Sequence, residues 1–301
     1  MNLSTAIRAV SLWSLALLQA TAIAGDTAID KRIAADPHGS VSVSNVSGRV
    51  EVRGWGRPEV QVTGALGSGV ERMDLVKDGN NTIVKVVLPH MSGWGRSQDA
   101  KLLVSVPAAS RIDVSTVSAD LNIANVSGPQ SLHTVSGDVA AEIDGGDFEL
   151  KSVSGDLTLH GSGQAASMRV STVSGDVRLT HGAGSLELTT VSGDVHAELK
   201  PASNLRVHTT SGDMRLDTML TRVAKVDLET VSGDLNFHGP SEGGFTTEVN
   251  SFSGDITTCF GAQSEHSREF GPGSKLRTSV GAGAALLRVK TLSGDVSICD
   301  K

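Results

Sequence analysis

The stretch Thr134-Val135-Ser136-Gly137-Asp138-Val139 decides the fold of this chain, because close copies of it recur. The aspartates of nine such Ser-Gly-Asp or Ser-Ala-Asp motifs are Asp120, Asp138, Asp156, Asp176, Asp194, Asp213, Asp234, Asp255 and Asp295. Successive aspartates are 18, 18, 20, 18, 19, 21, 21 and 40 residues apart. A period near 20 residues with a fixed turn motif indicates stacked repeats, or rungs, each of which buries its apolar face only against its neighbours.

The spacing of apolar residues within each rung predicts two strands. Counted from the aspartate, positions −8, −6, −3, +1 and +3 are apolar at all but four of 45 places, and position −7 is charged in eight of nine rungs. This alternation predicts a half-buried strand from −8 to −3, a Ser-Gly-Asp corner, and a second strand from +1 to +5. The alternation shifts at position −4, which carries Thr or Ser, and a β-bulge or a bend is expected there.

The repeats predict an all-β chain folded as a single-chain parallel β-solenoid, with rungs about 4.8 Å apart. Residues 25–110 are expected to form an atypical N-terminal β part and cap, in which Arg49 takes the aspartate position, and residues 111–301 the regular array. The last step of 40 residues is about two periods, so 256–286 holds either an extra rung or an inserted loop. Its polar, glycine-rich stretch favours an insertion at about 260–285.

The N-terminus predicts export. Arg8, the apolar run 9–20 and Ala22-Ile23-Ala24 form a signal peptide, residues 1–24, whose apolar run is too short for a membrane span. Without Arg8 the chain has 25 basic and 33 acidic residues, a net charge of −8. This acidic balance argues against nucleic acid or an anionic membrane as a partner. The expected location is the periplasm, the cell envelope or the cell exterior.

The repeated aspartates have two interpretations. In the favoured one, each is a structural turn residue whose carboxylate accepts hydrogen bonds from its own corner, as in an Asx-turn. In the alternative, the stacked carboxylates bind Ca²⁺, as in a calcium-binding β-roll. The second corner of each rung lacks a regular aspartate and the period drifts, so no cofactor is predicted.

Other candidate residues are few. Every rung carries nearly the same carboxylate, whereas polysaccharide cleavage needs two carboxylates in different environments, so no catalytic residue is predicted. The nine histidines never share one position on consecutive rungs, so no metal site is predicted. Two Gly-Trp-Gly-Arg segments, with Trp55 and Arg57 and with Trp94 and Arg96, are expected to cover the open end of the core. The alternative is that they contact a partner.

Cys259 and Cys299 both occupy position +4 of motif-bearing rungs. If those rungs are neighbours, the two Cα atoms fall within disulfide range, and an oxidising compartment allows the bond. The sequence therefore predicts a Cys259–Cys299 disulfide that holds the final rung and stabilises the fold by about 3–4 kcal/mol.

Several segments resemble the "putative adhesin" family of bacterial envelope proteins, a β-strand-repeat family of unknown function. They are the run Val41–Val62 with Gly54-Trp55, the strand end Val104–Pro107 and the Thr-Val-Ser-Gly-Asp-Val units. The resemblance covers nearly all of the chain after the signal peptide and implies no catalytic residues. We therefore expect a non-catalytic exported β-solenoid protein with an adhesin-like or scaffold role, whose partner is a protein, an envelope glycan or a second copy. A polysaccharide-active β-helix enzyme and a calcium-binding β-roll are the alternatives.

Overall fold

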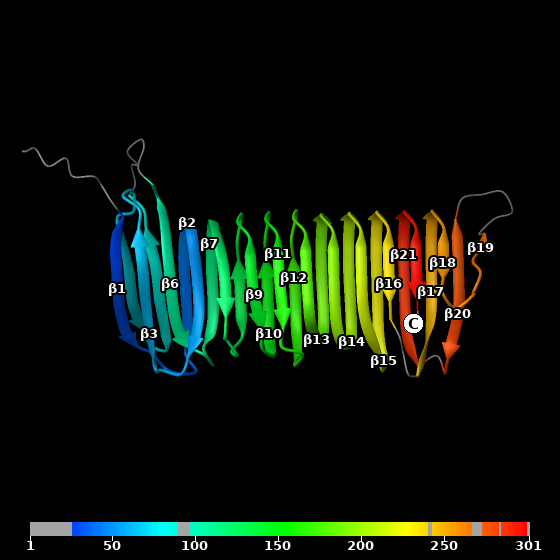
Figure 1. The fold of residues 1–301 in the computed structure, drawn as a ribbon, viewed down its shortest axis with the longest axis horizontal. Coiled ribbons are helices and arrows are strands. Elements are labelled where there is room, and N and C mark those ends of the chain that lie inside the picture. Colours follow the sequence, from blue (N-terminus) through cyan, green and yellow to red (C-terminus); the bar gives the residue numbers. More distant parts are fainter. Residues whose placement is uncertain (1–25, 90–96, 240–242, 267–272, 283, 300–301) are drawn as a thin grey trace, which may run out of the picture.

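A computed structural model of the chain describes residues 26–89, 97–239, 243–266, 273–282 and 284–299. Every regular element in these residues is a β-strand, which confirms the all-β prediction. The strands lie side by side in one long row of rungs (Figure 1). One continuous hydrophobic core runs through this row.

The regular rungs pair in parallel. For example, Leu157 lies opposite Val139 on one side and Val177 on the other. The strands before the corners form one face, called face A, and the strands after the corners form face B. These rungs contain β7 (Arg111–Ala124), β8 (Gln130–His133), β9 (Val139–Ile143), β10 (Gly146–Lys151), β11 (Leu157–Gly161), β12 (Ala165–Ser171), β13 (Val177–Ser192), β14 (Val195–Ser211), β15 (Met214–Ser232) and β16 (Leu235–His238). Their register shifts where β13 and β14 pass from one rung to the next, at residues 180–185 and 199–204.

The expected bulge at position −4 is wrong. The strand keeps strict alternation, so that positions −8, −6 and −4 point inward and position −3 points outward. In the rung of Asp138, Leu132 and Thr134 are buried whereas Val135 is 49% exposed. Thr134 can be buried because its hydroxyl donates to the carbonyl oxygen of Ser136 at 3.0 Å, which satisfies the buried polar group. The Thr or Ser at −4 therefore lines the core, and the apolar residue at −3 lies on the surface.

The N-terminal part closes one end of the stack with antiparallel strands. β2 pairs in parallel with β7, β5 and β6, whereas β3 pairs antiparallel with β6 and with β1. β4 forms an antiparallel pair with β5. The strands are β1 (Thr27–Ala34), β2 (Ser40–Trp55), β3 (Glu59–Leu66), β4 (Arg72–Asp78), β5 (Asn81–Val87) and β6 (Asp99–Pro107).

At the C-terminal end the spatial order of the rungs differs from their order in the chain. The strands are β17 (Gly244–Ser253), β18 (Ile256–Thr258), β19 (Glu265–His266), β20 (Ser274–Gly281), β21 (Ala285–Ser293) and β22 (Val296–Cys299). On face A, β21 pairs in parallel with both β15 and β17, and on face B, β22 pairs with β16 and β18. The rung of Asp295 is therefore intercalated between the rungs of Asp234 and Asp255.

The residues between β18 and β21 extend the stack with strands that run antiparallel to their neighbours. β20 pairs antiparallel with the outer side of β17, and β19 pairs antiparallel with β20. The long last step thus contains antiparallel strands, and β20 lies beyond the rung of Asp255 on face A.

The charges at position −7 on face A explain why the intercalated order is favourable. From the rung of Asp156 onward the spatial order is Glu149, Arg169, Glu187, Arg206, Asp227, Arg288 and Glu248, and Arg277 of β20 lies next to Glu248. Every neighbour has the opposite sign, and Glu248 lies 3.3 Å from both Arg288 and Arg277. Chain order would instead place Asp227 beside Glu248, and like charges on adjacent strands are destabilising.

Candidate functional site

The corners of the nine rungs form a continuous edge, called here the corner edge and defined as positions −3 to 0 of each rung. The glycine at −1 is required by its surroundings. Gly175 has a φ of +118°, and a Cβ atom there would lie 2.2 Å from the carbonyl oxygen of Gly155. Glycine alone combines this backbone conformation with so close a contact between rungs.

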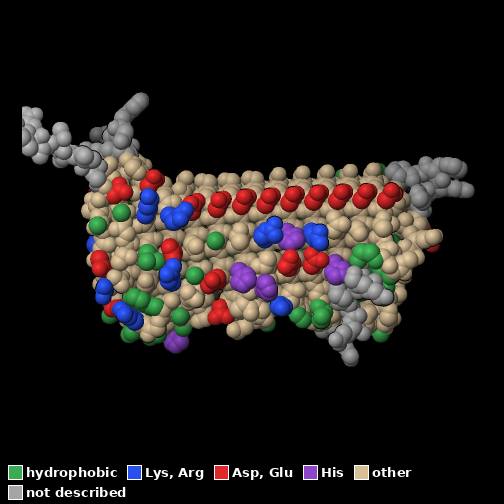
Figure 2. All heavy atoms as spheres, in the orientation of Figure 1, with side chains coloured by type: hydrophobic (Ala, Val, Ile, Leu, Met, Phe, Trp, Pro, Cys, Tyr) green, Lys and Arg blue, Asp and Glu red, His purple; other side chains and the backbone are tan. Residues whose placement is uncertain are grey.

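The nine motif aspartates form a ladder along this edge. The backbone N–H of each aspartate after Asp120 donates to the Oδ1 atom of the aspartate on the preceding rung in space, with N···O distances from 2.8 to 3.4 Å. The ladder confirms the intercalation, because Asp295 donates to Asp234 and Asp255 donates to Asp295. These carboxylate bonds join neighbouring rungs, so the expected Asx-turn within each corner is not what the structure shows. Figure 2 shows the ladder as an unbroken acidic row.

Arg49 lies at the N-terminal end of the Asp ladder, in the position that aspartate takes in the later rungs. Its Nη2 atom lies 3.3 Å from Oδ2 of Asp120. Oδ1 of the same carboxylate accepts the N–H of Asp138. The two carboxylate oxygens therefore have separate roles: Oδ1 joins the rungs, and Oδ2 faces a cation.

A second row, called the apolar ladder, runs beside the Asp ladder at position −3. Its apolar members are between 45% and 56% exposed. In spatial order the row is Val117, Val135, Val153, Val173, Val191, Thr210, Val231, Leu292 and Phe252. Single exposed apolar residues are normal on protein surfaces, whereas a contiguous row of them marks an interaction site. The corner edge thus combines an exposed apolar row with an exposed acidic row.

Two shallow depressions lie on face B beside the Asp ladder. One has a volume of about 450 Å³ and is lined by Arg49, Glu51, three ladder aspartates and Thr158, among others. The other, of about 300 Å³, lies over the next rungs, where Arg178, His196 and Arg215 follow one another on adjacent strands. Both depressions are open, and each is bordered by the acidic row.

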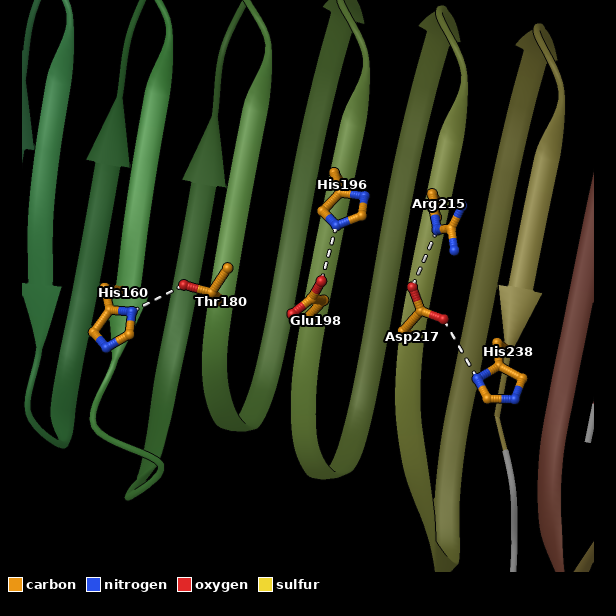
Figure 3. A network of polar contacts seen from close by, with 7 residues as sticks. All are labelled: His160, Thr180, His196, Glu198, Arg215, Asp217 and His238. Atoms are coloured by element: carbon orange, nitrogen blue, oxygen red, sulfur yellow. Dashed lines mark hydrogen bonds and ion pairs between the residues drawn. The ribbon is translucent and has the colours of Figure 1, made fainter. Parts of the chain in front are cut away.

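Polar side chains elsewhere on face B form separate small contacts (Figure 3). His196 lies 3.3 Å from Glu198 on the same strand, and His160 contacts the hydroxyl of Thr180 at 2.9 Å. Asp217 contacts both Arg215, at 3.3 Å, and His238, at 3.4 Å. Among the described residues no group of three or more His, Cys, Asp or Glu could hold a metal ion.

One described carboxyl has a shifted pKa. On face A the Lys151 ammonium lies 2.6 Å from the Glu149 carboxylate, and this hydrogen bond lowers the pKa of Glu149 below its usual value. The pair is exposed and lies outside the corner edge.

Trp55 and Arg57 lie at the end of β2 and in the turn that follows it. The indole N–H of Trp55 donates to the carbonyl oxygen of Glu59 at 2.9 Å, and the Arg57 guanidinium lies 5.0 Å from the centre of the indole ring. Arg57 also lies 3.6 Å from the Glu59 carboxylate. Trp94 and Arg96 lie outside the described residues, so the role of the two Gly-Trp-Gly-Arg segments as a cover of the core end, or as a partner contact, stays a prediction.

The predicted disulfide is confirmed. Cys259 and Cys299 are bonded, with their Cα atoms 4.8 Å apart. Its expected place is wrong, because the rung of Asp295 is an inner rung of the stack and the bond joins it to the outer rung of Asp255. The bond therefore fixes the intercalated segment between its neighbours.

Comparison with known proteins gives the class of the chain. The Toastrack DUF4097 family model matches residues 38–243 and 201–299. The chain therefore belongs to this family. No curated protein matches the chain.

Solved structures of similar chains are described as adhesins. A "putative adhesin" from Parabacteroides distasonis is 11% identical, with 90% of this chain and 97% of that chain covered and a TM-score of 0.42. A "putative adhesin" from Bacteroides fragilis is 10% identical, with 90% of this chain and 97% of that chain covered and a TM-score of 0.35. One from Parabacteroides merdae is 11% identical, with 90% of this chain and 95% of that chain covered and a TM-score of 0.35. Within the described residues no helix could span a membrane.

Proposed function

We propose that this chain is a non-catalytic, exported interaction protein, in which a parallel β-solenoid forms a rod and the corner edge is the contact surface. The observation that carries the proposal is the apolar ladder. Eight apolar side chains, each about half exposed, occupy the same position on stacked rungs. At a rung spacing of about 4.8 Å the nine positions span roughly 40 Å, which is long enough for a specific protein contact.

Three further features support this role. The resemblance to proteins described as adhesins agrees with a surface that binds a partner. The Cys259–Cys299 disulfide is typical of an oxidising compartment, such as the periplasm or the cell exterior. The described histidine and carboxylate groups of face B form separate contacts, such as His196 with Glu198 and His238 with Asp217, whereas general acid–base catalysis would place such groups around one substrate. The proposed function needs no cofactor.

Binding of the purified exported chain to the cell-envelope fraction of its source organism tests the proposal. The informative variant is Val153→Thr/Val173→Thr/Val191→Thr, which removes apolar surface from three adjacent rungs. Thr210 occupies the same position in the native stack, so threonine is compatible with the fold. The matched control is Val76→Thr, since Val76 is 51% exposed on β4, outside the corner edge.

The triple variant should bind the envelope at least tenfold more weakly, whereas the control should bind like the unaltered chain. Equal binding by the triple variant and the control, with both correctly folded, would contradict the role of the apolar ladder.

A further inference from the structure

Within the described part of the chain, eight of the nine ladder aspartates have an Oδ2 atom without an ion-pair partner. Oδ1 of each ladder aspartate except Asp255, the last in spatial order, accepts a backbone N–H from the neighbouring rung, so it is already used. Oδ2 of Asp120 lies 3.3 Å from the Arg49 guanidinium. Among the described residues, none of the other eight ladder aspartates forms an ion pair, and all eight are exposed. The ion pair of Arg49 with Asp120 is thus an example of the cationic contact that the other eight carboxylates lack.

The adjacent apolar ladder restricts the kind of partner further. A purely apolar surface would remove water from the carboxylates without replacing those interactions, which is costly. A purely cationic surface would leave the apolar ladder exposed. The complementary surface carries Lys or Arg side chains in one row and apolar side chains in the next.

A second copy of the chain does not provide such a surface along the same edge. If two rods met at their corner edges in antiparallel orientation, the two Asp ladders would face each other. In parallel orientation each Asp ladder would face an apolar ladder. Both arrangements leave buried carboxylates without a cation, which disfavours self-association through this edge.

We propose that the corner edge binds a basic protein surface, on which Lys or Arg side chains lie beside apolar ones. This inference rests on the proposed function and names the chemistry of its partner. The guanidinium or ammonium groups pair with the outward Oδ2 atoms, as Arg49 does with Asp120, and the apolar side chains cover the apolar ladder. Because the Asp ladder is exposed at its rim, the contact is sensitive to salt.

The probe for this proposal is a soluble 12-residue peptide of alternating Lys and Leu, with a Lys-Ser peptide and a Glu-Leu peptide as controls. The decisive variant is Asp156→Asn/Asp176→Asn/Asp194→Asn. Asparagine retains Oδ1 as the acceptor that joins the rungs but removes three negative charges. A variant with the same change in charge away from the corner edge is Asp78→Asn/Asp147→Asn/Glu265→Gln, in which all three residues are exposed.

The Lys-Leu peptide should bind the unaltered chain, and the corner variant should bind it at least tenfold more weakly, with a melting temperature no lower than that of the unaltered chain. The affinity of the control variant for the Lys-Leu peptide should fall less than threefold, and the Lys-Ser and Glu-Leu peptides should bind the unaltered chain weakly. Equal affinity of the two charge variants, or equal binding of the Glu-Leu peptide, would overturn the proposal. If the threonine triple variant loses envelope binding but the asparagine variant does not, the proposed function stands and the basic partner is refuted.

Discussion

The corner glycines offer a sharp test of how the rungs stack, and Gly175→Ala is the informative change. Gly175 lies in the middle of the array, with φ at +118° and the position of an added Cβ atom 2.2 Å from the Gly155 carbonyl oxygen. A left-handed conformation costs a non-glycine residue about 1–2 kcal/mol, and forcing an extra methyl group into packed surroundings costs typically another 1–3 kcal/mol. The substitution should therefore reduce the free energy of unfolding by about 2–5 kcal/mol.

The matched control is Gly79→Ala. Gly79 also has a positive φ, +59°, but an added Cβ atom would meet nothing within 4 Å. Only the conformational cost applies there, about 1–2 kcal/mol at most. Urea unfolding followed by circular dichroism measures both: with an m-value near 3 kcal/mol/M, Gly175→Ala should lower the midpoint by about 1 M, and Gly79→Ala by about 0.5 M or less. Equal shifts for the two variants would refute the close contact between corners.

Three further predictions follow from named contacts. Arg288→Glu places a third acid between Asp227 and Glu248 and should reduce the free energy of unfolding in urea titrations by about 1–2 kcal/mol. The control Arg111→Glu lies opposite the uncharged Ser40 and should change this free energy by less than about 0.5 kcal/mol. Replacing Cys259 and Cys299 with serine opens a loop with a sequence separation of 40 and should cost about 4 kcal/mol; a loss below 1 kcal/mol would contradict a stabilising role. Neighbouring ladder carboxylates about 5 Å apart repel each other by about 0.8 kcal/mol at the dielectric constant of water, and salt screens this repulsion. The melting temperature should therefore rise with added NaCl, and it should rise less for the Asp156→Asn/Asp176→Asn/Asp194→Asn variant.

The repeat was predictable because three signals agree: the spacing of the motifs, the apolar pattern at −8, −6, +1 and +3, and the glycine at −1. The sequence predicts position −3 wrongly, because a valine such as Val135 favours a buried position although the alternation that precedes it places this residue outward. Strict alternation from −8 places Thr134 inward, and a threonine has nearly the shape of a valine. Its hydroxyl can be buried because the Ser136 carbonyl oxygen accepts it at 3.0 Å. This error concealed the apolar ladder.

The intercalation was missed because the cysteines do not distinguish the two orders. The rungs of Asp255 and Asp295 are neighbours whether the last rung lies at the end of the stack or between two earlier rungs, so either order allows the disulfide. The charges at position −7 do carry the signal. Only the intercalated order places Arg288 between Asp227 and Glu248 and preserves the alternation of sign. The antiparallel pairing of β20 had no comparable signal, because strand direction at an edge depends on the connection and not on the local pattern.

Along the corner edge the rung of Asp295 lies between those of Asp234 and Asp255, and engineered cysteine pairs on face B measure this order most directly. Asn236 lies opposite Ser297, and Ser297 lies opposite Thr257. Oxidised Asn236→Cys/Ser297→Cys protein should yield a 236–297 disulfide-linked peptide on digestion and mass spectrometry, as the native Cys259–Cys299 pair does from an equivalent position. Asn236→Cys/Thr257→Cys protein, whose two sites are separated by the intercalated strand, should not crosslink. A 236–257 crosslink without a 236–297 crosslink would contradict the intercalated stack.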